Sequence, residues 1–406
     1  MHILLISDNF YPETNAPATR GFEHCKVWVK QGHKVTVITS FPNYPLGKIF
    51  AGYKNKFRNN ENIDGINVLR VWTYMSPNSG IWKRILDQAS FMFTSCINGL
   101  SIKNIDVIIG TTPHMFTPIA SLLLAKIKRT SFILELRDLW PDSMLAVGIN
   151  NKRYLYNIAK VIEKKLYFSA DLIIPVTYSF KKYLINLGFP EKKIKVVMNG
   201  VDTKFFNFKK NKYVKRSSKF FIISYIGTVG MAHSIKTIIE AAKVIHKNHK
   251  DKRIIFQIIG DGADKKNIEY EALNIKNVKV LPSVPKNQVL EYLDRTDAGI
   301  IHLKKNDLYK TVVPSKMFEY IAMGVPIIHG VDGESHNILK KYKLGLYFEQ
   351  ENPYALFSAI IKLYNDKSLY DEISKNCVKT SKVFEREILA LKMLEELKKF
   401  EKNKKQ

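Results

Sequence analysis

The segment 313–326, VPSKMFEYIAMGVP, holds residues whose types and spacing suit a charged ligand. Ser315 is typical of an N-cap, so we expect a helix to begin there. Lys316 and Glu319 are three residues apart and share one face of that helix. A lysine beside free helix N–H groups suits a diphosphate, and a carboxylate one turn further can accept both hydrogen bonds of a ribose diol. The alternative is an ordinary Lys–Glu pair on a solvated helix face.

Two glycine-containing turns are expected at strand ends. Gly227 and Thr228 follow an apolar run, and their backbone N–H groups together with the next helix could hold a phosphate. This turn is too short for a Walker loop, which also requires Gly-Lys-Ser/Thr. Gly260 and Asp261 follow another apolar run and could line a base pocket. Both turns are equally consistent with plain tight connections.

The segment 135–143, ELRDLWPDS, places charged side chains beside an aromatic ring at another expected strand end. Arg137, Asp138 and Trp140 combine hydrogen-bonding groups with a surface for ring stacking, which suits a sugar. The alternative is an Arg137–Asp138 salt bridge that closes the domain. Charges at a strand terminus cost more free energy than charges on an open surface, which favours the functional interpretation.

The long loop after the first expected strand, residues 8–20, lacks the Gly-x-Gly-x-x-Gly pattern of dinucleotide enzymes. This argues against an NAD or flavin oxidoreductase, because close approach of the backbone to a pyrophosphate needs those glycines. The loop carries Glu13, Asn15, Ala16 and Arg20. The alternative to a functional loop is a plain strand-to-helix connection. The ten histidines show no spacing typical of metal ligands, so no metal site is predicted.

Short apolar runs alternate with helical stretches around these residues, and this alternation predicts parallel α/β architecture. In the first half, strands are expected at 3–7, 34–39, 67–72, 107–110, 132–136, 172–176 and 195–198. Helices are expected at 18–31, 81–100, 118–128, 154–168 and 179–187. The basic segment 42–65 is expected to be a long unstructured connection.

A second series follows a polar, basic stretch at 209–219, which is the expected linker. Its expected strands are 220–227, 254–260, 278–282, 299–303 and 326–329, and its expected helices are 234–246, 263–273, 287–294 and 315–323. The region 353–399 has helical spacing, and the lysine-rich tail 398–406 is expected to fray. We therefore predict two Rossmann-like, doubly wound domains whose strand ends face a cleft. Their expected bounds are 1–205 and 206–380, followed by a C-terminal helix and basic tail at 381–406.

The composition is that of a folded globular protein, with 46% hydrophobic and 12% aromatic residues. Lys and Arg number 64 against 37 Asp and Glu, and the net charge of +27 indicates an anionic partner such as nucleic acid, a membrane surface or a phosphorylated substrate. Three distant cysteines indicate a reducing cytosol. The sequence shows no secretory signal and no apolar stretch long enough to span a bilayer, so a cytoplasmic location is expected.

Several short motifs, in order and spacing, resemble the GT-B-fold glycosyltransferases of family 4, and most closely their bacterial branch similar to L-fucosamine (FucNAc) transferases of O-antigen and capsule synthesis. The motifs cover nearly the whole chain. They are Tyr11-Pro12-Glu13 with Arg20, Gly32-His33-Lys34-Val35-Thr36-Val37, Asn43-Tyr44-Pro45, Arg137-Asp138-Leu139-Trp140-Pro141, Asn199-Gly200-Val201-Asp202, Gly260-Asp261-Gly262, and Pro314-Ser315-Lys316 through Ala322-Met323-Gly324-Val325-Pro326.

The resemblance implies two Rossmann-like domains facing a cleft, with last helices that cross back onto the N-terminal domain. It implies a nucleoside-diphosphate sugar held mainly by the C-terminal domain, and a transfer that retains anomeric configuration without an essential metal. Glu319 would bind the ribose hydroxyls, and Lys316 with the amides near Ser315 would meet the diphosphate. Arg137 and Asp138 would lie at the junction of sugar and acceptor.

The remaining site residues follow from the same resemblance. Gly227 and Thr228 would lie close to the phosphates, and Gly260 and Asp261 near the base. Glu13, Asn15, Ala16, Arg20 and Trp140 would serve the acceptor side. The donor would be a UDP-linked N-acetylated amino sugar.

The sequence departs from the family pattern at several places. The first Glu of the Glu-x7-Glu pattern is Thr311, and the glycine pair of the first loop is Asn15-Ala16. The basic pair that often follows the phosphate loop is replaced in the segment 231–234. The His of the usual His-Asp pair is Arg137.

The expected function is that of a retaining glycosyltransferase that moves a sugar from a nucleotide sugar to a growing surface polysaccharide or a lipid-linked acceptor. No cofactor is expected besides the nucleotide sugar as co-substrate. One alternative is a sugar-nucleotide 2-epimerase of the same fold, which would interconvert the donor without any acceptor. Another is a basic binder of nucleic acid or an anionic surface, but aromatic residues are not interleaved with the basic runs as a stacking platform requires.

A basic and apolar stretch, residues 82–86 with Phe91, Met92 and Phe93, could lie on anionic lipid near a polyprenyl-diphosphate-linked acceptor. The alternative is a helix that faces the protein core. Peripheral association with the inner face of the cytoplasmic membrane is therefore one of two expectations for the location.

Overall fold

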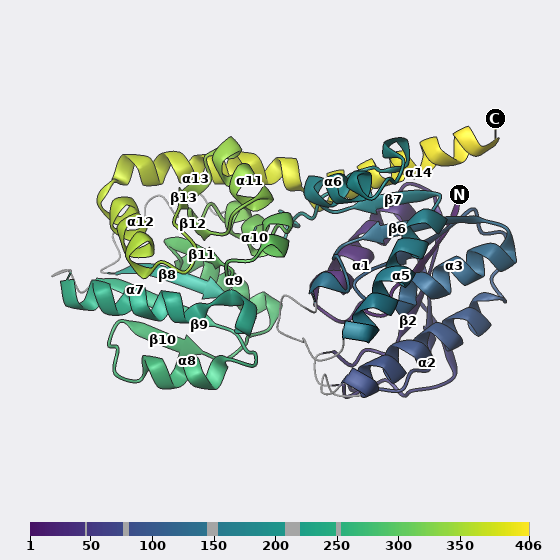
Figure 1. The fold of residues 1–406 in the computed structure, drawn as a ribbon, viewed down its shortest axis with the longest axis horizontal. Coiled ribbons are helices and arrows are strands. Elements are labelled where there is room, and N and C mark those ends of the chain that lie inside the picture. Colours follow the sequence, from purple (N-terminus) through teal and green to yellow (C-terminus); the bar gives the residue numbers. More distant parts are fainter. Residues whose placement is uncertain (45–46, 76–80, 144–152, 208–219, 249–252, 406) are drawn as a thin grey trace. The chain divides into compact units, whose positions relative to one another are not determined.

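The computed structural model describes residues 1–44, 47–75, 81–143, 153–207, 220–248 and 253–405 (Figure 1). The chain forms two compact units. Unit 1 comprises Met1–Met198 and Arg386–Gln406, and unit 2 comprises Asn199–Glu385. The linker expected at 209–219 lies outside the described residues.

Unit 1 is built on a seven-stranded sheet in the order β3-β4-β2-β1-β5-β6-β7. The strands are β1 (His2–Ile6), β2 (Lys34–Ser40), β3 (Arg58–Ile63), β4 (Ile66–Val71), β5 (Val107–Thr111), β6 (Ser131–Leu136) and β7 (Leu172–Pro175). Neighbouring strands are parallel except β3, which pairs with β4 in the antiparallel direction. The central strands are buried along their whole length, because helices cover both faces of a doubly wound sheet.

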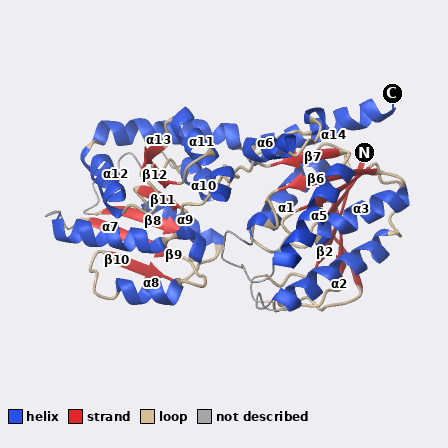
Figure 2. Ribbon diagram, viewed as in Figure 1, coloured by secondary structure: helices blue, strands red, loops and turns tan. Residues whose placement is uncertain are grey.

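Helices of unit 1 lie on opposite faces of this sheet (Figure 2). Its helices are α1 (Ala16–Lys30), α2 (Ile81–Gly99), α3 (Phe116–Lys128), α5 (Arg153–Ser169), α6 (Tyr178–Asn186) and α14 (Arg386–Lys405). Helices α2, α3 and α5 run side by side over one face, and α1 packs against α14 over the other. Between these two helices and the sheet lies a hydrophobic core that includes Ile3, Trp28, Val37 and Leu397.

Unit 2 is built on a six-stranded sheet, all parallel, in the order β10-β9-β8-β11-β12-β13. Its strands are β8 (Phe221–Ile226), β9 (Ile254–Ile259), β10 (Val278–Leu281), β11 (Ala298–His302), β12 (Ile327–Gly330) and β13 (Gly345–Tyr347). Its helices are α7 (Ile235–Asn248), α8 (Lys265–Ala272), α9 (Lys286–Arg295), α10 (Lys316–Ala322), α11 (Glu334–Tyr342), α12 (Pro353–Asn365) and α13 (Lys367–Ser381). The predicted parallel α/β architecture is confirmed in both units.

Three expectations about elements were wrong, and two elements were missed. The segment 42–65 contains strand β3, and α11 and β13 were not expected at all. Residues 195–198 form no named strand, although the N–H groups of Lys195 and Val197 donate to carbonyls of β7. The tail 398–406 does not fray, because α14 continues to Lys405.

Candidate functional site

In each sheet the chain starts in the middle, builds one side, and then returns to build the other. The reversal lies between β1 and β5 in unit 1, and between β8 and β11 in unit 2. Loops at the carboxyl ends of such neighbouring strands leave a crevice where ligands of doubly wound sheets bind. The predicted site residues are therefore described separately for each unit, beginning with unit 2.

The side chain of Lys316 packs next to Gly227, so two of the predicted donor residues are neighbours in the structure. A Cβ atom at Gly227 would stand 2.7 Å from Lys316 Cε, and Gly227 has a φ of +142°. The ammonium nitrogen of Lys316 is 3.6 Å from the ring centroid of Tyr225. Burial lowers the pKa of Lys316 to about 7, against the opposing effect of Glu319. The amine is thus poised to gain a proton when an anion approaches.

The turns after β8 and β9 interlock through their backbones. A Cβ atom at Gly260 would stand 1.8 Å from the carbonyl oxygen of Gly227, so only glycine fits there. The N–H of Val229 donates to the carbonyl of Asp261 at 2.8 Å, and Tyr225 donates its hydroxyl to the carbonyl of Thr228 at 2.6 Å. Gly227, Thr228, Gly260, Asp261 and Lys316 therefore form one cluster at the carboxyl ends of β8 and β9.

The start of α10 differs from the sequence expectation. Ser315 occupies the N-cap position, but its backbone is already helical and its side chain makes no capping hydrogen bond. A capping side chain requires an extended backbone at that position, so the predicted cap was wrong. Glu319 lies in the first turn of α10, on the same short helix as Lys316. Thr311, which stands where the family has a Glu, donates its hydroxyl to the carbonyl of Leu308 at 2.6 Å.

Two histidines in unit 2, one near Lys316 and one near the first, were missed as site residues. His233 is largely buried, its Nδ1 has no hydrogen-bond partner, and burial with the nearby charge of Lys316 lowers its pKa to about 3. His302, at the end of β11, accepts the N–H of Glu351 at 3.0 Å, and burial lowers its pKa to about 4. Both rings are neutral at physiological pH. The only sequence signal for His302 was its position at a strand end.

In unit 1, Arg20 forms a buried ion pair with Glu135. Its Nε donates to Glu135 Oε1 at 2.8 Å, and its Nη1 donates to the carbonyl of Met198 at 2.8 Å. Only 4% of the Arg20 side chain is exposed. Its guanidinium therefore ties α1 to β6 within unit 1, a structural role that the sequence did not suggest.

Arg137 is the partly exposed arginine at the end of β6. Its Nε is buried without a hydrogen-bond partner, and burial lowers its pKa to about 10 against the attraction of Glu135. The backbone N–H groups of Arg137 and Asp138 both donate to Thr112 Oγ1, at 2.8 and 3.2 Å. Among the described residues no Arg137–Asp138 salt bridge forms, so the alternative raised for this motif was wrong. Burial raises the pKa of Asp138.

The loop after β1 holds three of the expected acceptor-side residues. Glu13 is buried and its Oε1 accepts the N–H groups of Asn43 and Tyr44, each at 2.8 Å, while its Oε2 has no partner. Burial raises the pKa of Glu13. Asn15 caps α1 by accepting the N–H of Ala18, and the exposed Ala16 is the first residue of that helix.

Asp8 and His114 meet at the point where unit 1 reverses its strand order, and the sequence analysis did not single them out. Asp8 Oδ2 lies 3.4 Å from His114 Nδ1, a close contact without hydrogen-bond geometry. Burial raises the pKa of Asp8 to about 6, and burial lowers the pKa of His114 to about 4. The sequence signal that could have identified them is their position, because each follows one of the two strands between which the strand order reverses.

Trp140 lines a narrow cavity of about 20 Å³ together with Thr112, Asp138 and Tyr167. A cavity of this size holds a single water molecule and not a sugar ring. Trp140 and Asp138 are thus neighbours, as their spacing predicted.

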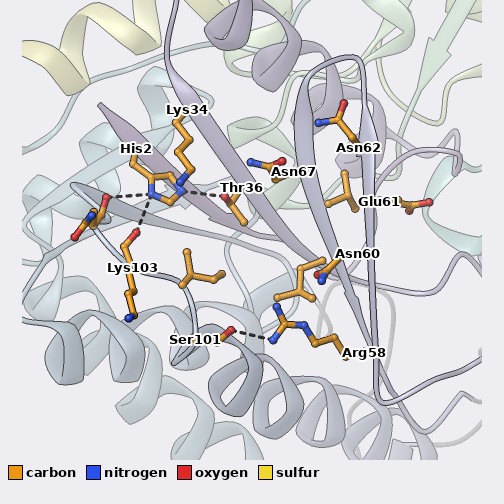
Figure 3. Close-up of a pocket in the computed structure, with 14 residues that line it drawn as sticks. His2, Lys34, Thr36, Arg58, Asn60, Glu61, Asn62, Asn67, Ser101 and Lys103 are labelled. Atoms are coloured by element: carbon orange, nitrogen blue, oxygen red, sulfur yellow. Dashed lines mark hydrogen bonds between the residues drawn. The ribbon is translucent and has the colours of Figure 1, made fainter.

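A larger pocket of about 700 Å³ lies at the opposite, amino ends of β1, β2 and β4 (Figure 3). His2 is engaged there, with Nε2 2.9 Å from Thr36 Oγ1 and Nδ1 3.0 Å from the carbonyl of Asn104. Arg58 donates to Ser101 Oγ at 3.0 Å. The pocket lacks every predicted site residue.

Two family models match the chain and together take in residues 19–380. Residues 19–205 match "Glycosyltransferase Family 4", and residues 206–380 match "Glycosyl transferases group 1". The chain therefore belongs to the group 1 and family 4 glycosyltransferases. Its two α/β units with parallel sheets have the GT-B fold, as the sequence predicted.

Individual relatives are distant. The chain is 25% identical over 339 residues to WcaI of Escherichia coli K12, a glycosyl transferase whose name assigns it to colanic acid biosynthesis, covering 80% of this chain and 82% of that one. The sucrose-phosphate synthase of Thermosynechococcus elongatus has a TM-score of 0.74 at 14% identity, with 98% of each chain covered. HepE of Anabaena, solved with UDP-glucose, has a TM-score of 0.70 at 12% identity, with 98% of this chain and 100% of that chain covered.

Proposed function

We propose that the protein transfers a sugar from a nucleoside-diphosphate sugar to a saccharide or polyprenyl-diphosphate-linked acceptor during surface-polysaccharide synthesis. The observation that carries the proposal is the cluster in unit 2, where Lys316 lies across Gly227 beside the turn of Gly260. A lysine with a pKa of about 7 suits a diphosphate better than a neutral ligand, because an anion favours its charged form. The N–H groups of Gly227 and Val229, which the sequence offered for a phosphate, instead donate to the carbonyls of Ile259 and Asp261.

The donor is proposed to be UDP-linked, with an N-acetylated amino sugar such as FucNAc. Binding of UDP-glucose by the structurally similar HepE supports the UDP part. In this arrangement Glu319 accepts from the ribose hydroxyls, Ser315 with Lys316 contacts the diphosphate, and Gly260 and Asp261 border the base. The name of WcaI supports a role in surface polysaccharide.

The acceptor side is assigned to the carboxyl edge of the sheet in unit 1. Three buried polar atoms without hydrogen-bond partners lie in loops at this edge: Arg137 Nε, Glu13 Oε2 and His114 Nδ1. Leaving such atoms unpaired costs about 1–3 kcal/mol each. A ligand rich in hydroxyl groups would supply both donors and acceptors to them.

The transfer is proposed to retain the anomeric configuration by a front-face reaction. The bond from the sugar C1 to the diphosphate oxygen breaks, and the bond from C1 to the acceptor oxygen forms on the same face. The acceptor proton passes to the leaving diphosphate. Lys316 stabilises the phosphate charge, while Arg137 and Asp138 orient the sugar and the acceptor hydroxyl. No metal is required in this scheme.

A panel of UDP, GDP, dTDP, CMP and NAD tests the nucleotide in thermal-shift and calorimetric measurements. We expect one nucleoside diphosphate to stabilise the wild type in a dose-dependent way. Glu319→Ala should weaken that binding by about tenfold or more, because the ribose diol would lose the carboxylate that accepts its hydrogen bonds. Glu372→Ala, which changes an exposed carboxylate on α13, is the matched control.

Two results would contradict the proposal. Equal binding by the Glu319→Ala and wild-type proteins would remove the ribose assignment, and the absence of any nucleotide binding would remove the donor site. Conversion of a UDP-sugar to its 2-epimer without acceptor would instead identify a sugar-nucleotide epimerase.

A further inference from the structure

Helix α2 exposes a stripe of large apolar side chains to solvent. Trp82 is 63% exposed, Phe93 is 64% exposed, and Leu86, Ile97 and the following Leu100 are also exposed. At about 100° per residue these positions fall within roughly 60° of one another around the helix axis. The opposite side of α2 is buried in unit 1, and besides Phe91 it carries the polar residues Thr94, Ser95 and Asn98. The more apolar side of α2 is therefore the side exposed to solvent, which is typical of a surface that binds a partner or a membrane.

The two neighbouring helices continue this pattern. On α3, Leu123 and Ile127 are exposed one turn apart. On α5, Tyr154, Ile158 and Val161 are exposed on one side. Because α3 contacts both α2 and α5, the three outward sides form one surface, which we call the outer helical face. Phe168 extends it at the end of α5.

The fully exposed charged side chains on these three helices are all cations. Exposed cations on this side are Lys83, Lys126, Arg129, Lys164 and Lys165, whereas Arg84 lies on the side of α2 away from the stripe. The carboxylates are only two. Asp87 is half-buried, and Glu163 is buried and accepts from Lys160 and Tyr167. The outer helical face therefore combines apolar side chains with cations and lacks a fully exposed carboxylate.

We propose that the outer helical face docks on an anionic lipid bilayer, with α2 lying in the plane of the interface. The exposed aromatic and aliphatic side chains would enter the headgroup boundary, and the flanking cations would meet anionic headgroups. The net charge of +27 also favours attraction to an anionic bilayer. A second copy of the chain fits less well, because a two-fold interface would bring the same cations face to face. None of the described helices is long and apolar enough to cross a membrane.

Vesicle flotation tests the docking with the full chain. We expect it to float with phosphatidylcholine vesicles that contain phosphatidylglycerol, and to remain in solution with phosphatidylcholine alone or at high salt. The double change Phe93→Ser and Ile97→Ser should weaken binding by about tenfold or more, because apolar burial is lost. Lys164→Glu with Lys165→Glu should weaken it by a similar factor.

Matched controls lie in unit 2. Tyr270→Ser with Leu273→Ser removes two apolar side chains that are even more exposed, on and just after α8, and Lys276→Glu with Lys279→Glu removes two exposed cations. Both controls should float as the wild type does. All variants alter exposed side chains and should keep the wild-type melting temperature.

Trp82 supplies an independent signal, because it lies on the stripe that would enter the lipid. Lipids brominated on the acyl chains should quench its fluorescence, and Trp82→Phe should remove most of that quenching. Equal flotation of the wild type and the Phe93→Ser, Ile97→Ser variant would overturn the proposal. A concentration-dependent dimer abolished by the same change would show instead that a second copy covers this face. These measurements do not depend on nucleotide binding, so failure of the membrane proposal can be distinguished from failure of the proposed function.

Discussion

Lys316 makes proton uptake a direct reporter of donor binding. With a pKa of about 7 in the free protein, the amine is mostly neutral at about pH 8. A bound diphosphate favours the charged form and raises that pKa, so binding must take up a proton. We expect uptake approaching one proton per UDP-glucose at about pH 8, and an affinity that falls as the pH rises above 7.

Calorimetry in buffers of different ionisation enthalpy measures this uptake. UDP-glucose is the better ligand, because its diphosphate is esterified at both ends and does not titrate near neutral pH. Lys316→Arg is the control, since arginine remains protonated and should bind without uptake. Binding by the wild type with no proton uptake would show that Lys316 does not meet the diphosphate.

Gly260 packs closely against the carbonyl group of Gly227, so substituting Gly260 tests the contact between the two turns. Gly260→Ala would force a Cβ atom to within 1.8 Å of a carbonyl oxygen at a φ of +156°. We expect loss of nucleotide binding and a destabilisation above the roughly 1–2 kcal/mol that a positive φ alone costs. Gly188→Ala is the control, because Gly188 has a φ of +88° and open space around it. Equal unfolding free energies for the two variants would contradict the interlocked turns.

The sequence identified the residues of the donor cluster because they follow apolar runs or begin a helix, and both features are local. It did not identify His233, Asp8 or His114, whose environment depends on strand order. Asp8 and His114 are 106 positions apart in the chain and meet only because β1 pairs with β5. Arg20 illustrates the same limit, since its partner Glu135 comes from β6.

At the scale of elements, α14 completes the core of unit 1 although it ends the chain. Leu397 is fully buried in the core shared with β1 and α1, and Trp28 donates its indole N–H to the carbonyl of Ala390 at 3.0 Å. Leu397→Ala should lower the unfolding free energy by about 2–5 kcal/mol. Ile388→Ala on the same helix should change it by less than about 0.5 kcal/mol, because Ile388 is 53% exposed. Denaturant titrations that gave equal losses would contradict this packing of α14.

Strand β3 shows why one element was missed and which signal could have found it. Its sequence, RNNENI, is polar and rich in asparagine, which is uncommon in strands. An edge strand needs only one hydrogen-bonded neighbour, so tertiary pairing with β4 outweighs this weak propensity. Asp64 and Gly65 have φ values of 51° and 83°, as in the tight turn that joins two hairpin strands. That Asp-Gly pair was the available signal.

The lysine-rich tail was mistaken for a frayed end for a different reason. Its charges suggested solvent, yet Glu401 is buried against Ser131, and Lys404 donates to the same hydroxyl at 2.8 Å. Their shared partner, Ser131, lies about 270 residues earlier in the chain. Composition alone therefore could not reveal it.

At the scale of the whole molecule, the chain contains two units, each with its own sheet and core. The fold class followed from the alternation of apolar runs and helical stretches, which extends through both units. The assignment of α14 to unit 1 did not follow from periodicity, because a helix pattern does not state which sheet it covers. Donor binding is assigned to unit 2 in the proposed function.

Amide hydrogen exchange with and without the bound nucleoside diphosphate tests that claim most directly. We expect protection of at least about tenfold in the segments 226–231, 260–262 and 315–319, because a bound ligand suppresses their local opening. The pocket of His2 and Arg58 in unit 1 should exchange as before and serves as an internal control. Protection confined to unit 1, with these three segments of unit 2 unchanged, would contradict the account.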